Sequence, residues 1–147
     1  MLRRLILVLL PLLALGCAGS PGRVLLTDSD NLREVSSFDL CRSFFLHPAV
    51  KVRQELQERN EFTPEEWSYI DEQRIHVGMR ELVLVCAWGY PGFFGSVAES
   101  LIDDVTHRQW VYRACPGCKA LYVYTENSKV TGWQTLRKEF PPEPPSP

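Results

Sequence analysis

Alternating apolar and polar residues mark the last third of the chain as β-structure. The alternation occupies the segments 108–114, 119–125 and 129–136. Because successive side chains of a strand point to opposite faces, this period of two is typical of strands. Asn127 and Ser128 separate the second and third segments, as the two residues of a tight hairpin turn would. The pattern predicts a three-stranded antiparallel meander, and it assigns residues 92–107 to a preceding loop.

The middle of the chain carries a set of local helix-start signals. Thr63 and Glu66 have the spacing of a capping box, and Pro64 between them suits the first helical position. Phe62 and Trp67 occupy the two positions of a hydrophobic staple, which fixes how the chain enters the helix. Together these residues predict a helix that begins at Pro64 and ends near residue 73.

Apolar periodicity predicts three further helices. The first covers 37–46, and the second covers 48–60 with Pro48 as its first residue. The last lies within 78–91, where Gly89 and a following proline end the helical pattern. Its apolar residues at helical spacing are Met79, Leu82, Val83 and Cys86. Helices followed by strands predict an α+β fold in which one layer of helices packs on one face of the sheet.

The N-terminus has the features of a secretory signal. Arg3 and Arg4 precede an apolar run over 5–15, which is too short to span a membrane, since a spanning helix needs roughly 20 residues. The sequence Ala-Leu-Gly-Cys ending at Cys17 resembles the lipobox of bacterial lipoproteins, in which this cysteine is acylated and becomes the mature N-terminus. By the same resemblance, Ala18 implies delivery to the periplasmic face of the outer membrane of a Gram-negative bacterium. A plain signal peptide with an incidental cysteine is the alternative.

These patterns divide the chain into five parts. Residues 1–16 are expected to be the signal peptide, and 17–35 the lipidated cysteine with a flexible tether rich in Gly, Pro and Ser near its start. A helical segment follows over 36–77, and an α+β domain over 78–136. Residues 137–147 form a proline-rich tail, which is expected to be extended because proline cannot donate backbone hydrogen bonds.

Four short motifs between residues 78 and 134 occur together in one known family. A Gly-Met pair at 78–79 is followed by Gly-Tyr-Pro at 89–91, Trp-Val-Tyr at 110–112 and a hairpin over 122–133. In this order and spacing they resemble the BamE (SmpA/OmlA) family of small outer-membrane lipoproteins. The resemblance implies a BamE-like α+β domain and a binding or adaptor role in envelope or outer-membrane protein assembly.

Aromatic side chains are concentrated on the expected meander, and both of its faces carry apolar residues. A single layer of helices covers one face, so the second face is either a contact surface for a partner protein or the seat of the N-terminal helices. Aromatic residues dominate many protein interfaces because each buries a large area. The candidate partner-contact residues are Trp110, Tyr112, Tyr122, Tyr124 and Trp133.

The cysteines suggest disulfides. Cys115 and Cys118 enclose Pro-Gly, which suits the centre of a tight turn, and an oxidising compartment favours a disulfide across it. A metal site and a redox-active pair are the alternatives for this motif, although a reactive thiolate is usually stabilised at a helix N-terminus. Cys41 and Cys86 remain as a second pair or as buried free thiols, because four cysteines permit three pairings and spacing does not choose among them.

The charge and the motifs of the chain argue against a nucleic-acid-binding protein and against an enzyme. Loss of Arg3 and Arg4 with the signal peptide makes the formal charge of −2 more negative by two, and there is no basic patch for nucleic acid. Serine, histidine and aspartate do not form a nucleophile–base motif, so no enzymatic activity, cofactor or metal is expected. The sequence predicts a non-enzymatic binding module with a membrane anchor and envelope protein partners. A periplasmic thiol–disulfide or metal-handling protein and a small inhibitor-like domain are the alternatives.

Overall fold

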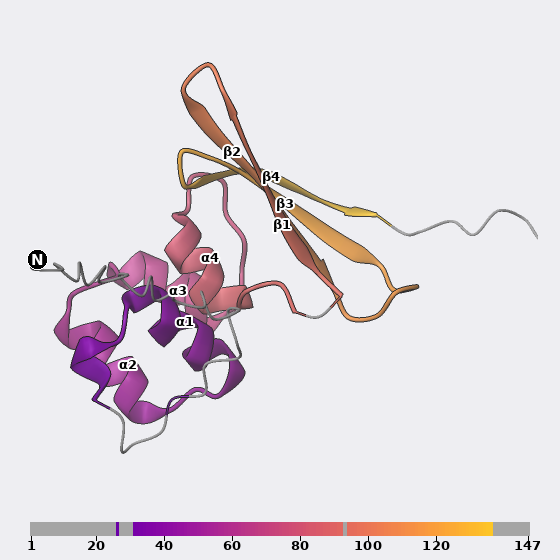
Figure 1. Cartoon of the computed structure of the whole chain (residues 1–147). Helices are drawn as coiled ribbons and strands as arrows, with labels where there is room; N and C mark the ends of the chain where they lie inside the picture. The colour runs from indigo at the N-terminus through magenta and orange to yellow at the C-terminus, as the bar shows by residue number, and fades with distance from the viewer. Residues whose placement is uncertain (1–25, 27–30, 93, 137–147) are drawn as a thin grey trace, which may run out of the picture.

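The computed structural model describes residues 26, 31–92 and 94–136, in which helices are followed by an antiparallel sheet (Figure 1). This order confirms the α+β class. The expected signal peptide, Cys17 and the proline-rich tail lie outside the described residues. Residues 31–35 were expected to belong to the tether. They instead include the short 3-10 helix η1 (Leu32–Glu34), and Leu32 is buried in the hydrophobic core.

Four α-helices lie within the described residues: α1 (Ser37–Leu46), α2 (Val50–Glu58), α3 (Pro64–Asp71) and α4 (Glu81–Trp88). The capping box of α3 is confirmed, because the Thr63 hydroxyl accepts from the Glu66 backbone and the Glu66 carboxylate accepts from the Thr63 backbone. The expected start of α2 at Pro48 is wrong. Ala49 has extended backbone and acts as the N-cap, so the helix begins only at Val50.

The Gly-Met pair expected to open the last helix has a different role. Gly78 has a φ of +89°, which glycine adopts readily, and its backbone N–H donates to the carbonyl of Val130 over 2.7 Å. Val130 in turn donates to the carbonyl of Met79 over 2.9 Å. These backbone groups are paired with the sheet, and Arg80 forms an isolated antiparallel bridge with Lys129. The turn at Gly78 and the two residues after it therefore lie beside β4, and α4 begins only at Glu81.

The sheet has four strands rather than three: β1 (Ser96–Ile102), β2 (Val105–Arg113), β3 (Ala120–Glu126) and β4 (Lys129–Leu136), in this spatial order. All neighbours are antiparallel. The expected loop over 92–107 therefore contains β1 and the start of β2. Its residues are largely exposed, so they lack the apolar alternation that marks a strand. Backbone pairing with β2 across the tight turn at Asp103 and Asp104 stabilises β1 instead.

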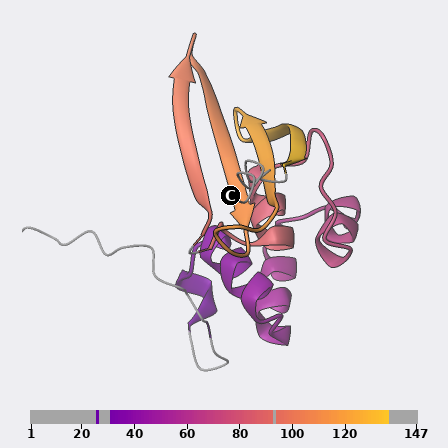
Figure 2. The same cartoon turned by 90° about the vertical axis from the view of Figure 1, so that its right-hand side faces the viewer.

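The helices pack on one face of the sheet, and the β1–β2 hairpin extends away from them (Figures 1 and 2). The core contains Leu40 of α1, Leu56 of α2 and Leu84 of α4 together with Trp110 and Val123 of the sheet. The core is therefore continuous between the helical segment 36–77 and the sheet.

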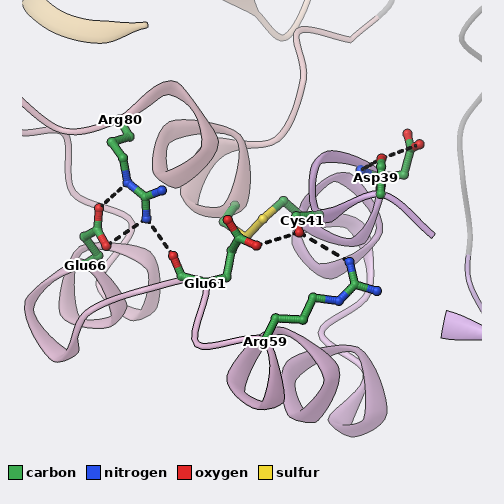
Figure 3. Close-up of a disulfide and its surroundings, with 9 residues drawn as sticks. Asp39, Cys41, Arg59, Glu61, Glu66 and Arg80 are labelled. Atoms are coloured by element: carbon green, nitrogen blue, oxygen red, sulfur yellow. Dashed lines mark hydrogen bonds and ion pairs between the residues drawn. A yellow bond between two sulfur atoms is a disulfide. The ribbon is translucent and has the colours of Figure 1, made fainter. Parts of the chain in front are cut away.

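A disulfide links α1 to α4 within this core. Cys41 of α1 and Cys86 of α4 are bonded, with 4.2 Å between their Cα atoms, and both are buried (Figure 3). Nearby, the Arg80 guanidinium donates to the Glu66 carboxylate and to the carbonyl of Glu61, which joins the start of α4 to α3 and to the turn that precedes it. The helices thus form one covalently braced layer.

Candidate functional site

The five candidate aromatic residues do not share one surface. In an antiparallel sheet, directly paired residues point to the same face. Trp110 pairs with Val123, which pairs with Trp133, whereas Val111 pairs with Tyr122. The helix-covered face therefore carries Trp110, Tyr112 and Trp133, and the opposite face carries Tyr122 and Tyr124. The expectation of a single five-residue contact surface is corrected by this register.

Trp110 and Tyr112 serve the interior of the protein. Trp110 is 3% exposed, and its indole N–H donates to the Thr125 hydroxyl over 3.2 Å. The Tyr112 phenol donates to the carbonyl of Gly89 over 3.1 Å, and its ring meets Trp88 edge-to-face with 6.0 Å between centroids. Burial raises the pKa of Tyr112, so the phenol stays protonated and can donate its hydrogen bond to Gly89. These two aromatic residues hold the end of α4 on the sheet.

The other face of the sheet, which we call the open face, is the first candidate binding surface. It carries Tyr122 and Tyr124, both half-buried, and the Tyr124 phenol accepts from the Gln134 amide over 2.5 Å. The sheet residues that belong to or pack on the main hydrophobic cluster lie on the opposite side, whereas Val111 and Ala120 are buried on this one. A shallow hollow of about 310 Å³ lies beside Tyr124 and His107. An aromatic surface that the described helices leave uncovered suits protein contact.

The second candidate is a cleft of about 1130 Å³ between the helices and the end of the sheet, which we call the junction cleft. The last turn of α1 and the end of α4 form one side, and the adjoining ends of β2 and β3 form the other. Its large apolar lining residues are Phe45, Leu46, Trp88, Tyr90, Tyr112 and Leu121. Gly89 shapes the helical side, because a Cβ at this position would overlap the Phe45 ring. A concave, aromatic-lined site of this kind is typical of ligand and peptide binding.

Cationic side chains accompany the aromatic rings of the junction cleft. Arg42, Arg113 and Lys119 line it, and none of its described lining residues is acidic. Arg42 contacts Asp39 at 3.5 Å and lies over the Tyr90 ring. Within the described residues, neither Arg113 nor Lys119 has an ion-pair partner, and the Nε of Arg113 is buried without a hydrogen-bond partner. As far as the described residues go, the cleft therefore offers an anionic ligand two positive charges that have no ion-pair partner.

The motif Cys-Pro-Gly-Cys forms the turn between β2 and β3 at the edge of this cleft. Cys115 and Cys118 are bonded, with 5.1 Å between their Cα atoms, and the Cys118 N–H donates to the Cys115 carbonyl over 3.1 Å. The flanking residues Ala114 and Lys119 line the cleft. Because the pair lies between strands rather than at a helix N-terminus, no helix dipole stabilises a thiolate there. The geometry is that of a structural disulfide that closes the turn beside the cationic residues.

Sequence patterns identified the aromatic strands and both cysteine pairs as candidates but not the junction cleft. The cleft draws its lining from positions between 42 and 135, and no local spacing relates them. The main sign of the cleft in the sequence is the pair Phe45 and Leu46, two large apolar residues at the end of the helix predicted over 37–46. Both are exposed in the structure. In the same described ranges there is no group of three or more metal-ligating side chains. None of the helices seen there is long and apolar enough to span a bilayer.

Comparison with known proteins found no matching family model, no matching curated protein and no matching solved structure.

Proposed function

We propose that this chain is a lipid-anchored, non-enzymatic binding or adaptor module on the periplasmic face of the outer membrane. Its partner is an envelope protein, and its work belongs to envelope or outer-membrane protein assembly, as for the BamE family that residues 78–134 resemble. The lipobox-like sequence ending at Cys17 supports the anchor. The two disulfides support an exported location, because disulfides persist in oxidising compartments such as the periplasm.

The observation that carries this proposal is the open face of the sheet. Tyr122 and Tyr124 lie there two positions apart on β3, on the side away from the main hydrophobic cluster. Tyr124 also lines the hollow together with His107. Tyrosine supplies a large contact area and a hydroxyl group for hydrogen bonds at low cost in side-chain entropy. A lipid anchor at Cys17 confines the module to the membrane surface, so even a modest contact area there benefits from a high effective concentration of membrane partners.

Site-specific photocrosslinking in cells tests the proposal. A photoreactive phenylalanine analogue at Tyr124 is expected to capture an envelope protein, and a second substitution, Tyr122→Ser, is expected to reduce that capture. The same analogue at Glu58, an exposed position on α2, is the matched control and is expected to capture nothing specific. Capture that is unaffected by Tyr122→Ser, equal capture from both positions, or no capture from position 124 would contradict the assigned surface.

A further inference from the structure

We propose that the junction cleft binds the chain's own proline-rich segment, residues 137–147. This segment reads Arg-Lys-Glu-Phe-Pro-Pro-Glu-Pro-Pro-Ser-Pro. It follows directly on β4. Its prolines match the aromatic lining of the cleft, and the carboxylates of Glu139 and Glu143 match the cations there, although Arg137 and Lys138 balance them in formal charge. The segment would then act as an internal ligand that a partner has to displace before it reaches the cleft.

The position of β4 places the start of the segment at the cleft. Thr135 lines the cleft, and Leu136, the last residue of β4, pairs with Ala120 next to Lys119. The last described residues before the segment therefore line or adjoin the cleft. Eleven residues in the extended polyproline conformation reach roughly 34 Å, at about 3.1 Å per residue, which is ample for a cleft of this size.

The apolar lining suits a proline-rich ligand. Polyproline segments bind grooves lined by aromatic rings, because the proline rings pack on flat aromatic faces and the extended helix loses little entropy on binding. Phe45, Trp88, Tyr90 and Tyr112 supply such rings in the lining of the junction cleft. Four of the five residues 141–145 are proline, and Phe140 precedes them as an apolar anchor.

The proline-rich part of the segment complements the charges of the cleft, because residues 139–147, beyond Arg137 and Lys138, contain two carboxylates and no basic side chain. Glu139 and Glu143 lie within the segment, whereas Arg113 and Lys119 line the cleft without an ion-pair partner among the described residues. Opposite charges favour the docked state and set its register, although each exposed pair contributes only about 0.2–1 kcal/mol. Since none of the described lining residues is acidic, the two carboxylates within residues 139–147 are the matching groups that the chain itself supplies next to these cations.

This inference concerns the junction cleft and not the open face, so its test is independent of the test of the proposed function. The test uses the purified full-length chain, with no partner present. Phe140 is replaced by a photoreactive phenylalanine analogue, and crosslinked peptides are mapped by mass spectrometry. We expect crosslinks to peptides that contain residues 42–46, 88–92 or 113–121. Mixing isotopically labelled and unlabelled chains distinguishes a crosslink within one chain from one between two chains.

Charge variants show whether the crosslink reports specific docking. The double substitution Glu139→Lys and Glu143→Lys alters only the segment and is expected to lower the crosslink yield roughly fivefold, as loss of two exposed ion pairs predicts. Arg113→Glu with Lys119→Glu should lower it similarly, and combining all four substitutions should restore it. Lys129→Glu, at the far end of β4, is the matched control. Crosslinks only between chains, crosslinks elsewhere on the chain, no crosslink, or a yield insensitive to the segment charges would overturn the proposal.

Discussion

Glu81, in the first turn of α4, forms an ion pair with Arg108 of β2, with 2.5 Å between the carboxylate and guanidinium groups. The second oxygen of Glu81 accepts the hydroxyl of Thr125, which itself accepts the indole N–H of Trp110. The Glu81 side chain is 12% exposed, so this carboxylate joins the helical layer to three residues of the sheet almost out of water. Arg108 also pairs with Glu99, which is 58% exposed.

These two carboxylates on one arginine give a matched pair of variants. Glu81→Gln is expected to reduce the free energy of unfolding by about 1–3 kcal/mol, because it weakens hydrogen bonds in a nearly buried network. Glu99→Gln should reduce it by less than about 1 kcal/mol, since exposed ion pairs contribute little. Urea unfolding of the purified variants measures both. Equal losses would contradict the structural role assigned to Glu81.

The two disulfides are expected to differ in their contribution to stability. Cys41 and Cys86 are 45 residues apart and close a long loop, whereas Cys115 and Cys118 are three apart. Chain-entropy arguments give about 4 kcal/mol for the first and about 2 kcal/mol for the second. Replacing each pair with alanine and comparing unfolding curves checks this order. Mass spectrometry of non-reduced peptides should also recover each pair in its own crosslinked fragment, and any other pairing would contradict the structure.

The division of the aromatic residues predicts a division of mutant effects. Trp110→Ala should cost about 3–5 kcal/mol, as truncation of a buried aromatic residue usually does. Tyr124→Ser should change stability far less and should instead abolish co-purification of the envelope partner. Trp133→Ser is the control, because Trp133 is 47% exposed but lies on the helix-covered face. Loss of the partner with Trp133→Ser but not with Tyr124→Ser would refute the assignment of the open face.

The capping box of α3 predicts an acid-sensitive contribution to stability. Hydrogen bonds from the Arg80 guanidinium hold the pKa of Glu66 below its usual range. The Glu66 carboxylate therefore binds a proton more readily in the unfolded chain than in the folded protein. Its contribution to the free energy of unfolding is complete above about pH 4.3 and is lost as pH falls through the lower folded-state pKa. The free energy of unfolding, measured at about pH 7 and about pH 3, should therefore fall less between these two pH values for Glu66→Gln than for the unchanged protein. Glu58→Gln, on the exposed side of α2, should behave like the unchanged protein.

The proposed anchor predicts a covalent modification at Cys17. The mature chain is expected to begin at this residue and to carry acyl groups detectable by mass spectrometry. Cys17→Ser should leave the protein soluble or unprocessed, because the hydrophobic attachment to the membrane is absent. Cell fractionation measures the distribution. A Cys17→Ser variant that still fractionates with the outer membrane would show that the lipid anchor is not what holds the protein there.

The features that the sequence determined by itself are those built from residues close together along the chain. The Thr63–Glu66 capping box and the two-residue turn at Asn127 and Ser128 depend on interactions over three or four positions, and both occur as expected. The same holds for the order of helices and strands, because amphipathic periodicity is local. The Cys115–Cys118 turn was also readable, since a disulfide over so short a span needs no distant element to bring it together.

Tertiary structure decided everything that depends on distant residues. β1 exists because β2 pairs with it, although its own exposed residues give little sign of a strand. Cys41 finds Cys86 only because α1 packs on α4, and the register of the sheet separates Tyr122 from Trp110. The junction cleft likewise exists only where the ends of helices and strands meet. Packing of apolar surface brings these residues together, and packing depends on the shape of the whole core rather than on sequence spacing.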